Sequence, residues 1–278
     1  MTWLRDARAR FHAKCLAGPI TETRGVPSVA DVSNTSSREI ATEMVAKIGP
    51  LISHAEKPAG QTAGSLFEAA CQDFLAECFE QFAHLRPGRF SVERGQPISR
   101  YAQYAHLDEL RALANASRTL KTHLGTDYLI KPDVVVVREA ETDVAINQSG
   151  ELVDASVAGN TGLRQANGAR ATLHASVSCK LTIRSDRVQN TRSEALNLIR
   201  NRKGRLPHIV AVTAEPVPSR IAAIALGTGD MDCVYHFALP ELVETLREQE
   251  RDTLELVETM IDGQRLRDIS DLPLDLVI

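Results

Sequence analysis

The segment Ser176-Val177-Ser178-Cys179-Lys180-Leu181-Thr182-Ile183-Arg184-Ser185-Asp186-Arg187 joins two kinds of local pattern. Its first part lies in a β-rich run, Leu173–Ile183, because branched and small apolar side chains favour extended backbone. Its second part opens Asp186–Asn201, where apolar residues recur at helical spacing. We predict a strand that runs directly into a helix, with Ser185 as the N-terminal cap and Gly204 as the stop.

The rest of the chain predicts a mixed sheet flanked by helices. Downstream and upstream of the central segment we expect strands at Tyr128–Arg138 and His208–Thr213, a hairpin from Ile221–Leu226 and Asp232–Ala238, and closing helices at Leu239–Gln249 and Asp252–Ile261. The first 130 residues are predicted to be mostly helical, at Trp3–Leu16, Ser37–Ser53, Thr62–Leu85 and Leu107–Ser117. Glu139–Arg170 is polar and is predicted to be an irregular insertion. We expect an α/β fold in one domain, residues 1–278, with the strand-rich part at 128–238.

Composition limits the class of protein. Of 278 residues, 43% are hydrophobic and 24% are charged, which is ordinary for a soluble globular protein. The 5 cysteines are odd in number and form no Cys-x-x-Cys pair, so we expect reduced thiols and neither a disulfide framework nor a zinc ribbon. The N-terminus has no signal-peptide core, and no apolar run reaches membrane-spanning length. The predicted compartment is the cytosol, with no membrane partner.

The charge distribution permits a nucleic-acid partner without requiring one. A net charge of -4 counts against DNA binding, whose usual footprint is a basic domain. From Arg184 to Arg205, however, the sequence contains seven basic residues and two acidic ones. A locally positive surface of this kind can hold a polyanion. A solvated helix face is the other interpretation, and charge alone does not separate the two.

Acidic residues and a lysine form a candidate hydrolytic cluster. Asp133 opens the predicted strand at Val134, Lys180 ends another strand, and Glu194 follows fourteen residues later on the predicted helix. Phosphodiester hydrolysis is assisted by hard cations held by carboxylates, and Mg²⁺ needs few of them. Ser178 and Lys180 share a strand face, whereas Cys179 points the other way and offers its backbone carbonyl. Each residue also has a simpler role, as a strand-start acid, a solvated lysine or a surface ion-pair partner.

The start of the predicted helix holds side chains suited to reading bases. Arginine binds guanine through two parallel hydrogen bonds, and a carboxylate accepts from cytosine. Arg184, Asp186 and Arg187 at a helix entry would match the half-sites of CCGG in the major groove. An Arg–Asp–Arg surface network is the alternative. Glu68, an acid on an otherwise apolar helix face, is either a buried ion-pair partner or a ligand.

These residues occur in strings that resemble a known family. The strings are Ser178-Cys179-Lys180, Arg184-Ser185-Asp186-Arg187, Glu194, Arg202-Lys203-Gly204-Arg205-Leu206-Pro207-His208, Gly60-Gln61-Thr62, Tyr101-Ala102-Gln103-Tyr104-Ala105-His106-Leu107, Thr213-Ala214-Glu215-Pro216 and Asp268-Ile269-Ser270-Asp271-Leu272-Pro273-Leu274. The chain resembles the CCGG family of type II restriction endonucleases over nearly its whole length. It diverges mainly in Glu139–Arg170 and at the N-terminus.

The resemblance implies the PD-(D/E)XK nuclease fold with an altered motif. Ser178 stands where most such nucleases have an acid, and that role moves to Glu194 on the helix. By resemblance, Asp133, Glu194 and the Cys179 carbonyl would be ligands for Mg²⁺. Lys180 would be the catalytic lysine. Glu68 would be an additional acid beside the site.

The same resemblance assigns DNA contacts and an assembly. Arg184, Asp186 and Arg187 match the readers of CCGG, Asp31 and Arg220 the pair that reads the outer G·C, and Gln61 a minor-groove contact. The implied target is GCCGGC in double-stranded DNA, cut after the first G to leave four-base 5′ overhangs. Family members act as homotetramers, two dimers back to back, and a restriction enzyme requires a cognate methyltransferase in its host.

Two other functions remain open at the level of sequence. A non-catalytic protein that binds CCGG would use the same arginines but would leave Asp133, Lys180 and Glu194 without a common purpose. A PD-(D/E)XK repair nuclease would recognise DNA structure and cut flaps or nicked DNA that lacks the hexanucleotide.

Overall fold

A mixed sheet forms the centre of the molecule. The computed structural model describes residues 2–50, 60–125, 129–227 and 229–278, apart from the side chains of residues 124 and 185–187. Within these ranges the large sheet is 6-stranded, in the order β3-β4-β5-β6-β7-β8. Its strands are β3 (Phe90–Arg94), β4 (Val134–Arg138), β5 (Thr172–Lys180), β6 (His208–Thr213), β7 (Cys233–His236) and β8 (Leu266–Asp268). The β3–β4 and β4–β5 pairs are antiparallel, and β5 to β8 are parallel. The predicted α/β class with a mixed sheet flanked by helices is confirmed.

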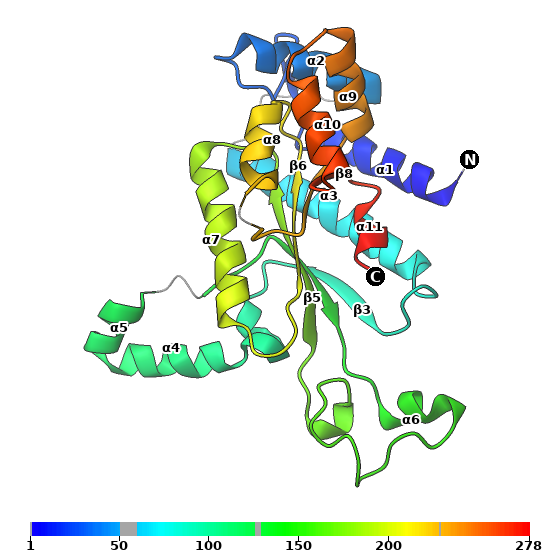
Figure 1. Cartoon of the computed structure of the whole chain (residues 1–278), viewed down its shortest axis with the longest axis vertical. Helices are drawn as coiled ribbons and strands as arrows, with labels where there is room; N and C mark the ends of the chain where they lie inside the picture. The colour runs from blue at the N-terminus through cyan, green and yellow to red at the C-terminus, as the bar shows by residue number, and fades with distance from the viewer. Residues whose placement is uncertain (1, 51–59, 126–128, 228) are drawn as a thin grey trace.

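Helices cover the sheet and connect its parallel strands. They are α1 (Trp3–Ala17), α2 (Thr35–Ile48), α3 (Gly60–Gln81), α4 (His106–Ala116), α5 (Arg118–Leu124), α6 (Asp143–Ile146), α7 (Ser185–Asn201), α8 (Pro218–Ala225), α9 (Leu239–Glu248), α10 (Leu254–Asp262) and α11 (Leu272–Asp275). Helix α3 packs on β3, β4 and β5, while α7 and α8 lie against each other and connect β5 to β6 and β6 to β7 (Figure 1). A small two-stranded sheet, β1 (Glu22–Thr23) with β2 (Val26–Pro27), precedes α2.

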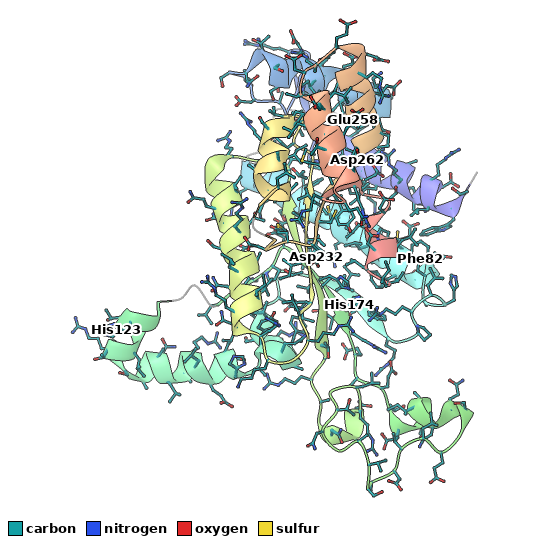
Figure 2. The ribbon with its side chains drawn as sticks, in the orientation of Figure 1. Phe82, His123, His174, Asp232, Glu258 and Asp262 are labelled. Carbon is teal, nitrogen blue, oxygen red and sulfur yellow. The ribbon has the colours of Figure 1, made fainter. Side chains whose placement is uncertain are left out.

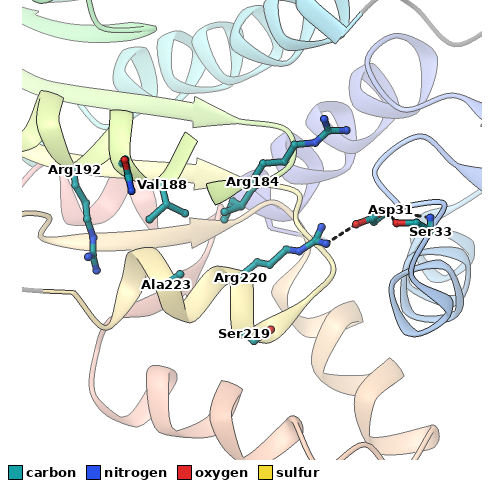
Figure 3. A pocket seen from close by; sticks show the side chains of 10 residues that line it. Asp31, Ser33, Arg184, Val188, Arg192, Ser219, Arg220 and Ala223 are labelled. Atoms are coloured by element: carbon teal, nitrogen blue, oxygen red, sulfur yellow. Dashed lines mark hydrogen bonds and ion pairs between the residues drawn. The ribbon is translucent and has the colours of Figure 1, made fainter. Parts of the chain in front are cut away.

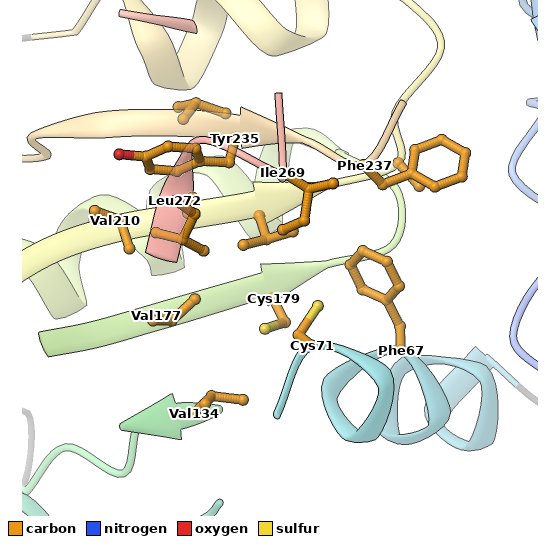
Figure 4. Close-up of a cluster of buried hydrophobic side chains, with 14 of the residues drawn as sticks. Phe67, Cys71, Val134, Val177, Cys179, Val210, Tyr235, Phe237, Ile269 and Leu272 are labelled. Atoms are coloured by element: carbon orange, nitrogen blue, oxygen red, sulfur yellow. The ribbon is translucent and has the colours of Figure 1, made fainter. Parts of the chain in front are cut away.

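The core explains why the two central strands are so apolar. Strand β4 has four consecutive valines, each at most 1% exposed, because it lies between β3 and β5 and is covered on its faces. On the side of the sheet toward α3, Cys179 packs beside Cys71 and near Phe67 (Figure 4). The side chain of Cys179 is therefore used in packing, and Lys180 points the opposite way.

Two segments extend away from this body. Residues 139–171 leave the end of β4 and contain the short helix α6, and the α4–α5 pair projects in another direction (Figure 1). Within residues 139–171, the Arg164 guanidinium donates two hydrogen bonds of 2.7 Å to Asp143 and so holds the segment together. The expectation of a largely irregular insertion is confirmed. No helix in the described part of the chain is both long and apolar enough to cross a membrane.

The predicted hairpin is wrong. Its first half, Ile221–Leu226, lies mainly in helix α8, and β7 pairs in parallel with β6, so α8 is a crossover helix. Pro218 stands in the first turn, and Ile221, Ile224 and Ala225 are buried at helical spacing. An apolar run this short is compatible with either a strand or a helix. Here the parallel pairing of β6 with β7 requires a crossover connection, which α8 provides.

Other boundaries also differ from the expectations. Strand β3 lies within the part expected to be helical, and β8 and α11 were not predicted. Arg184, and not Ser185, occupies the N-cap position of α7. The end of the predicted Ser37–Ser53 helix and the start of the predicted Tyr128–Arg138 strand lie outside the described residues. One of the buried ring side chains of the sheet is His174, on β5 (Figure 2).

Candidate active site

Strand pairing brings Asp133 to Lys180. Val134 pairs with Val177 in the antiparallel β4–β5 ladder, so the residue just before β4 lies beside the last residues of β5. The Lys180 ammonium donates to Oδ2 of Asp133 at 2.7 Å, and the Cys179 backbone N–H donates to the same oxygen at 2.8 Å. Burial acts to lower the pKa of Lys180, but the attraction of Asp133 outweighs it and the pKa is raised. The lysine is therefore held in its charged form.

Two glutamates from helices face the same pair. Burial raises the pKa of Glu194 on α7, and the charge of Asp133 adds to the rise while Lys180 opposes it. Burial likewise raises the pKa of Glu68 on α3; Asp133 adds to this, and Lys180 and Arg94 oppose it. Asp133 and Lys180 thus each act electrostatically on both glutamates, so charged side chains predicted from the sequence lie near one another.

The cluster fits a divalent cation completed by other ligands. The Lys180 ammonium pairs with Asp133, and burial is the main cause of the raised pKa values of Glu68 and Glu194, to which the charge of Asp133 adds. Among the described residues, no set of three or more His, Cys, Asp or Glu side chains is arranged to hold a metal ion by itself. Mg²⁺ takes few protein carboxylates and fills its octahedron with waters and phosphate oxygens. Asp133, Glu194 and the Cys179 carbonyl are oxygen donors of that kind.

Ser178 lies on β5, where it pairs with Ala211 of β6. It is 8% exposed, and its hydroxyl has no hydrogen-bond partner within the residues that the structure describes. It occupies the same strand face as Lys180, two residues away. A serine hydroxyl carries no negative charge, so Ser178 itself supplies no acid at this point of β5.

Several residues predicted to act in catalysis and in base recognition line one cavity. A cavity of about 330 Å³, which we call the site cavity, is lined by Lys180, Glu68 and Glu194 and also by Arg184. Gln61, at the start of α3, is exposed on its rim. The structure thus brings residues from α3, β5 and α7 to a single opening. The side chains of Asp186 and Arg187 lie outside the described residues, so the structure leaves their predicted roles untested.

Asp31 and Arg220 meet across 189 positions of sequence. The Arg220 guanidinium donates to Oδ2 of Asp31 at 2.5 Å, and the Ser33 hydroxyl donates to Oδ1 at 2.7 Å. The Arg220 hydrogen bond, followed by those from Ser33, lowers the pKa of Asp31 to about 2. The pair lines a second cavity, of about 760 Å³, together with Arg184 on α7 (Figure 3). We call this opening the recognition cavity.

The sequence did not single out Glu215, which lies directly behind these residues. It is 0% exposed and accepts hydrogen bonds from the backbone N–H groups of Ile183 and Val217. Arg192 on α7, which also lines the recognition cavity, was counted only as a basic residue. An acid two residues after the apolar strand His208–Thr213 was the available signal for Glu215.

A six-stranded mixed sheet with an acid–lysine pair at the end of two neighbouring strands, and a second acid on the next helix, defines a restriction-endonuclease-like nuclease. The sequence profile described as NgoMIV restriction enzyme matches residues 11–278. The type II restriction enzyme NgoMIV of Neisseria gonorrhoeae is 51% identical over 279 aligned residues, which cover 98% of this chain and 97% of that protein. The chain belongs to the NgoMIV restriction enzyme family. As such it is a type II restriction endonuclease, a site-specific deoxyribonuclease.

Proposed function

We propose that this enzyme is Mg²⁺-dependent, recognises GCCGGC and cuts after the first G to leave four-base 5′ overhangs. The observation that carries the proposal is the Lys180–Asp133 contact of 2.7 Å, in a site that opens beside Arg184, Asp31 and Arg220. Chemistry and base recognition then occur at neighbouring positions on one DNA duplex. We further propose that residues 1–278 form one domain.

In this proposal the residues of the cluster divide the work. Asp133, Glu194 and the Cys179 carbonyl would hold the cation, which when bound supplies charge neutralisation at the phosphate and lowers the pKa of a water. The charged Lys180 orients the attacking water and stabilises negative charge that develops on the phosphoryl oxygens. Glu68, whose pKa burial raises, lies where it can hold a proton or a further water beside the cluster. Ser178 keeps the β5 face small at this point.

Base recognition is assigned to the two cavities. Arg184, Asp186 and Arg187 at the start of α7 would read the CCGG core, since two arginines suit guanines and an aspartate suits cytosine amino groups. Asp31 and Arg220 would read the outer G·C pair from the recognition cavity. Gln61, at the mouth of the site cavity, would contact the minor groove. Arg184 and Gln61 are exposed, and Asp31 and Arg220 are partly exposed. These four residues line the site cavity together with the partly buried Lys180, which supports this division.

The palindrome implies an assembly. Each half-site would be read by one subunit of a two-fold dimer. We propose a homotetramer of two such dimers in the cytoplasm, with a cognate methyltransferase that protects the host DNA without being bound. A plasmid with two sites should then be cut faster than a plasmid with one, and sedimentation should give four times the chain mass.

Digestion of plasmid DNA tests the proposed function. Purified enzyme with Mg²⁺ should linearise a plasmid that contains GCCGGC, and run-off sequencing should place both breaks after the first G. The control reaction contains EDTA. Specific binding without cleavage in Mg²⁺ would favour a DNA-binding protein, and cutting of flaps that lack the hexanucleotide would favour a repair nuclease. Either result would contradict the proposal.

A further inference from the structure

Glu215 is a fully buried carboxylate at the junction of the two recognition elements. It lies two residues after the end of β6 and has no exposed side-chain surface. Burial raises its pKa, and its hydrogen bonds with Ile183 and Val217 oppose that rise. A buried carboxylate lowers the stability of the fold unless its oxygens are paired, so the partners of Glu215 indicate what the residue does here.

Its two oxygens hold two different elements. Oε2 accepts from the backbone N–H of Ile183 at 2.8 Å, and Ile183 immediately precedes Arg184 and the start of α7. Oε1 accepts from the backbone N–H of Val217 at 3.1 Å, and Val217 is the N-cap residue of α8. One side chain therefore fixes the starting points of both helices that carry proposed base readers.

The second oxygen also faces the outer reader. The Arg220 guanidinium lies 3.7 Å from Oε1 of Glu215 and donates to Asp31 with its other nitrogen. The guanidinium is thus held between a buried carboxylate behind it and an exposed one in front. Figure 3 shows Arg220 directed at Asp31, with Arg184 among the other side chains that line the recognition cavity.

We propose that Glu215 is a positioning residue that couples readout of the inner and outer base pairs, by holding the starts of α7 and α8 at a fixed mutual position. This inference rests on the proposed function, because it uses Arg184 and Arg220 as base readers. Glu215 is fully buried and would not contact the DNA itself. Its effect is on discrimination between sequences, which depends on the placement of the guanidinium groups to a fraction of an ångström.

The test replaces Glu215 with Gln in the full chain. The amide oxygen of glutamine can accept a hydrogen bond from one backbone N–H, but the amide NH₂ then faces the other N–H. One of the two hydrogen bonds is therefore lost, together with the negative charge. The matched control is Asp268→Asn, since Asp268 is a buried carboxylate that accepts from the Leu239 N–H but lies at β8, away from both cavities. Cleavage rates are measured on the sequence that the wild-type enzyme cuts fastest, found by end sequencing, and on its single-base variants.

We expect Glu215→Gln to lower the preference for the best sequence by about tenfold at both inner and outer positions, the effect of losing a hydrogen bond to a charged group. Asp268→Asn should lower thermal stability and leave the preferences unchanged. Unchanged preferences in Glu215→Gln, or a loss at the outer pair alone, would overturn the coupling. If that variant does not fold by circular dichroism, Glu215→Asp applies the same test, because it keeps the charge but withdraws the carboxylate from Ile183. The preferences are scored on whichever sequence the wild-type enzyme cuts fastest. If that sequence is not GCCGGC, the proposed function is contradicted, but the test of Glu215 still applies.

Discussion

The ammonium group of Lys180 faces carboxylates carried by three separate parts of the chain. Asp133 precedes β4, Glu68 lies on α3 and Glu194 lies on α7, and each affects or is affected by the charge of the lysine. One ammonium group offsets only one of the three carboxylates, and a bound Mg²⁺ would offset the remaining negative charge. Removal of the lysine should therefore affect the reaction more than the binding of DNA.

We predict that Lys180→Met abolishes cleavage while specific binding is kept. The methionine fills the volume of the lysine but cannot orient water or stabilise the phosphoryl oxygens, so the single-turnover rate should fall about a hundredfold or more. Gel-shift competition in Ca²⁺ measures binding, and quench-flow measures cleavage. Lys14→Met, on an exposed lysine of α1, is the control and should behave as wild type. Retained cutting by Lys180→Met would contradict the assigned site.

At the outer base pair, we predict that Arg220→Ala relaxes specificity at that position and leaves the CCGG core unaffected. Loss of a bidentate contact costs about 1–3 kcal/mol of discrimination. Competition binding on ACCGGT against GCCGGC measures the outer pair, and a core mismatch measures the inner pairs. If ACCGGT and GCCGGC are discriminated as well as by the wild-type enzyme, Arg220 is not the outer reader.

Among the secondary-structure elements, the sequence predicts best those in which one clear local pattern continues over several residues. Strand β5 and helix α7 were found because a β-rich run changes to a helical period at one place, near Arg184. Helix α8 was mistaken for a strand because its eight residues are too few to establish a period. Strand β8, with three residues, owes its conformation to pairing with β7, which no local pattern reveals.

An ion-pair network ties α1 to α9 and β8. Arg8 donates to Asp268 at 2.9 Å and to Glu241 at 2.6 Å, and the three side chains are largely buried. We predict that Arg8→Ala destabilises the protein by about 3–5 kcal/mol, because it leaves two largely buried carboxylates without their cationic partner. Urea unfolding measures the loss. Arg10→Ala removes the exposed pair with Glu77 and should cost less than about 1 kcal/mol. Equal costs for the two variants would contradict this view of the network.

Across the whole molecule, the candidate site is assembled from distant parts of the chain. The sequence identified Asp133, Lys180 and Glu194 because each stands at the end or on the face of a recognisable element. The position of Asp31 against Arg220, and the role of Glu215 behind both, depend on how loops meet in three dimensions. Residues that act through buried backbone hydrogen bonds have no chemical motif in sequence, which is why Glu215 was not predicted.

Buried histidines should make the stability of the whole fold depend on pH. Burial lowers the pKa of His174 and of His236 to about 4. An unfolded histidine takes up a proton near pH 6.5, whereas these two remain neutral in the folded state until about pH 4. Their contribution is therefore present above pH 6.5 and is lost as the pH falls toward 4, by about 3 kcal/mol for each histidine. The carboxyl groups with raised pKa values, such as Glu215, act in the opposite direction.

A variant of one histidine separates these contributions. His174 lies among Phe79, Phe90 and His208, so we predict that His174→Phe keeps the ring packing and loses less stability than wild type between pH 6.5 and 4. The free energy of unfolding in urea is measured at several pH values, and the carboxyl groups contribute equally to both proteins. His123→Gln, an exposed residue on α5 (Figure 2), is the control and should follow the wild-type curve. If His174→Phe also follows that curve, protonation of His174 does not limit the acid stability of the fold.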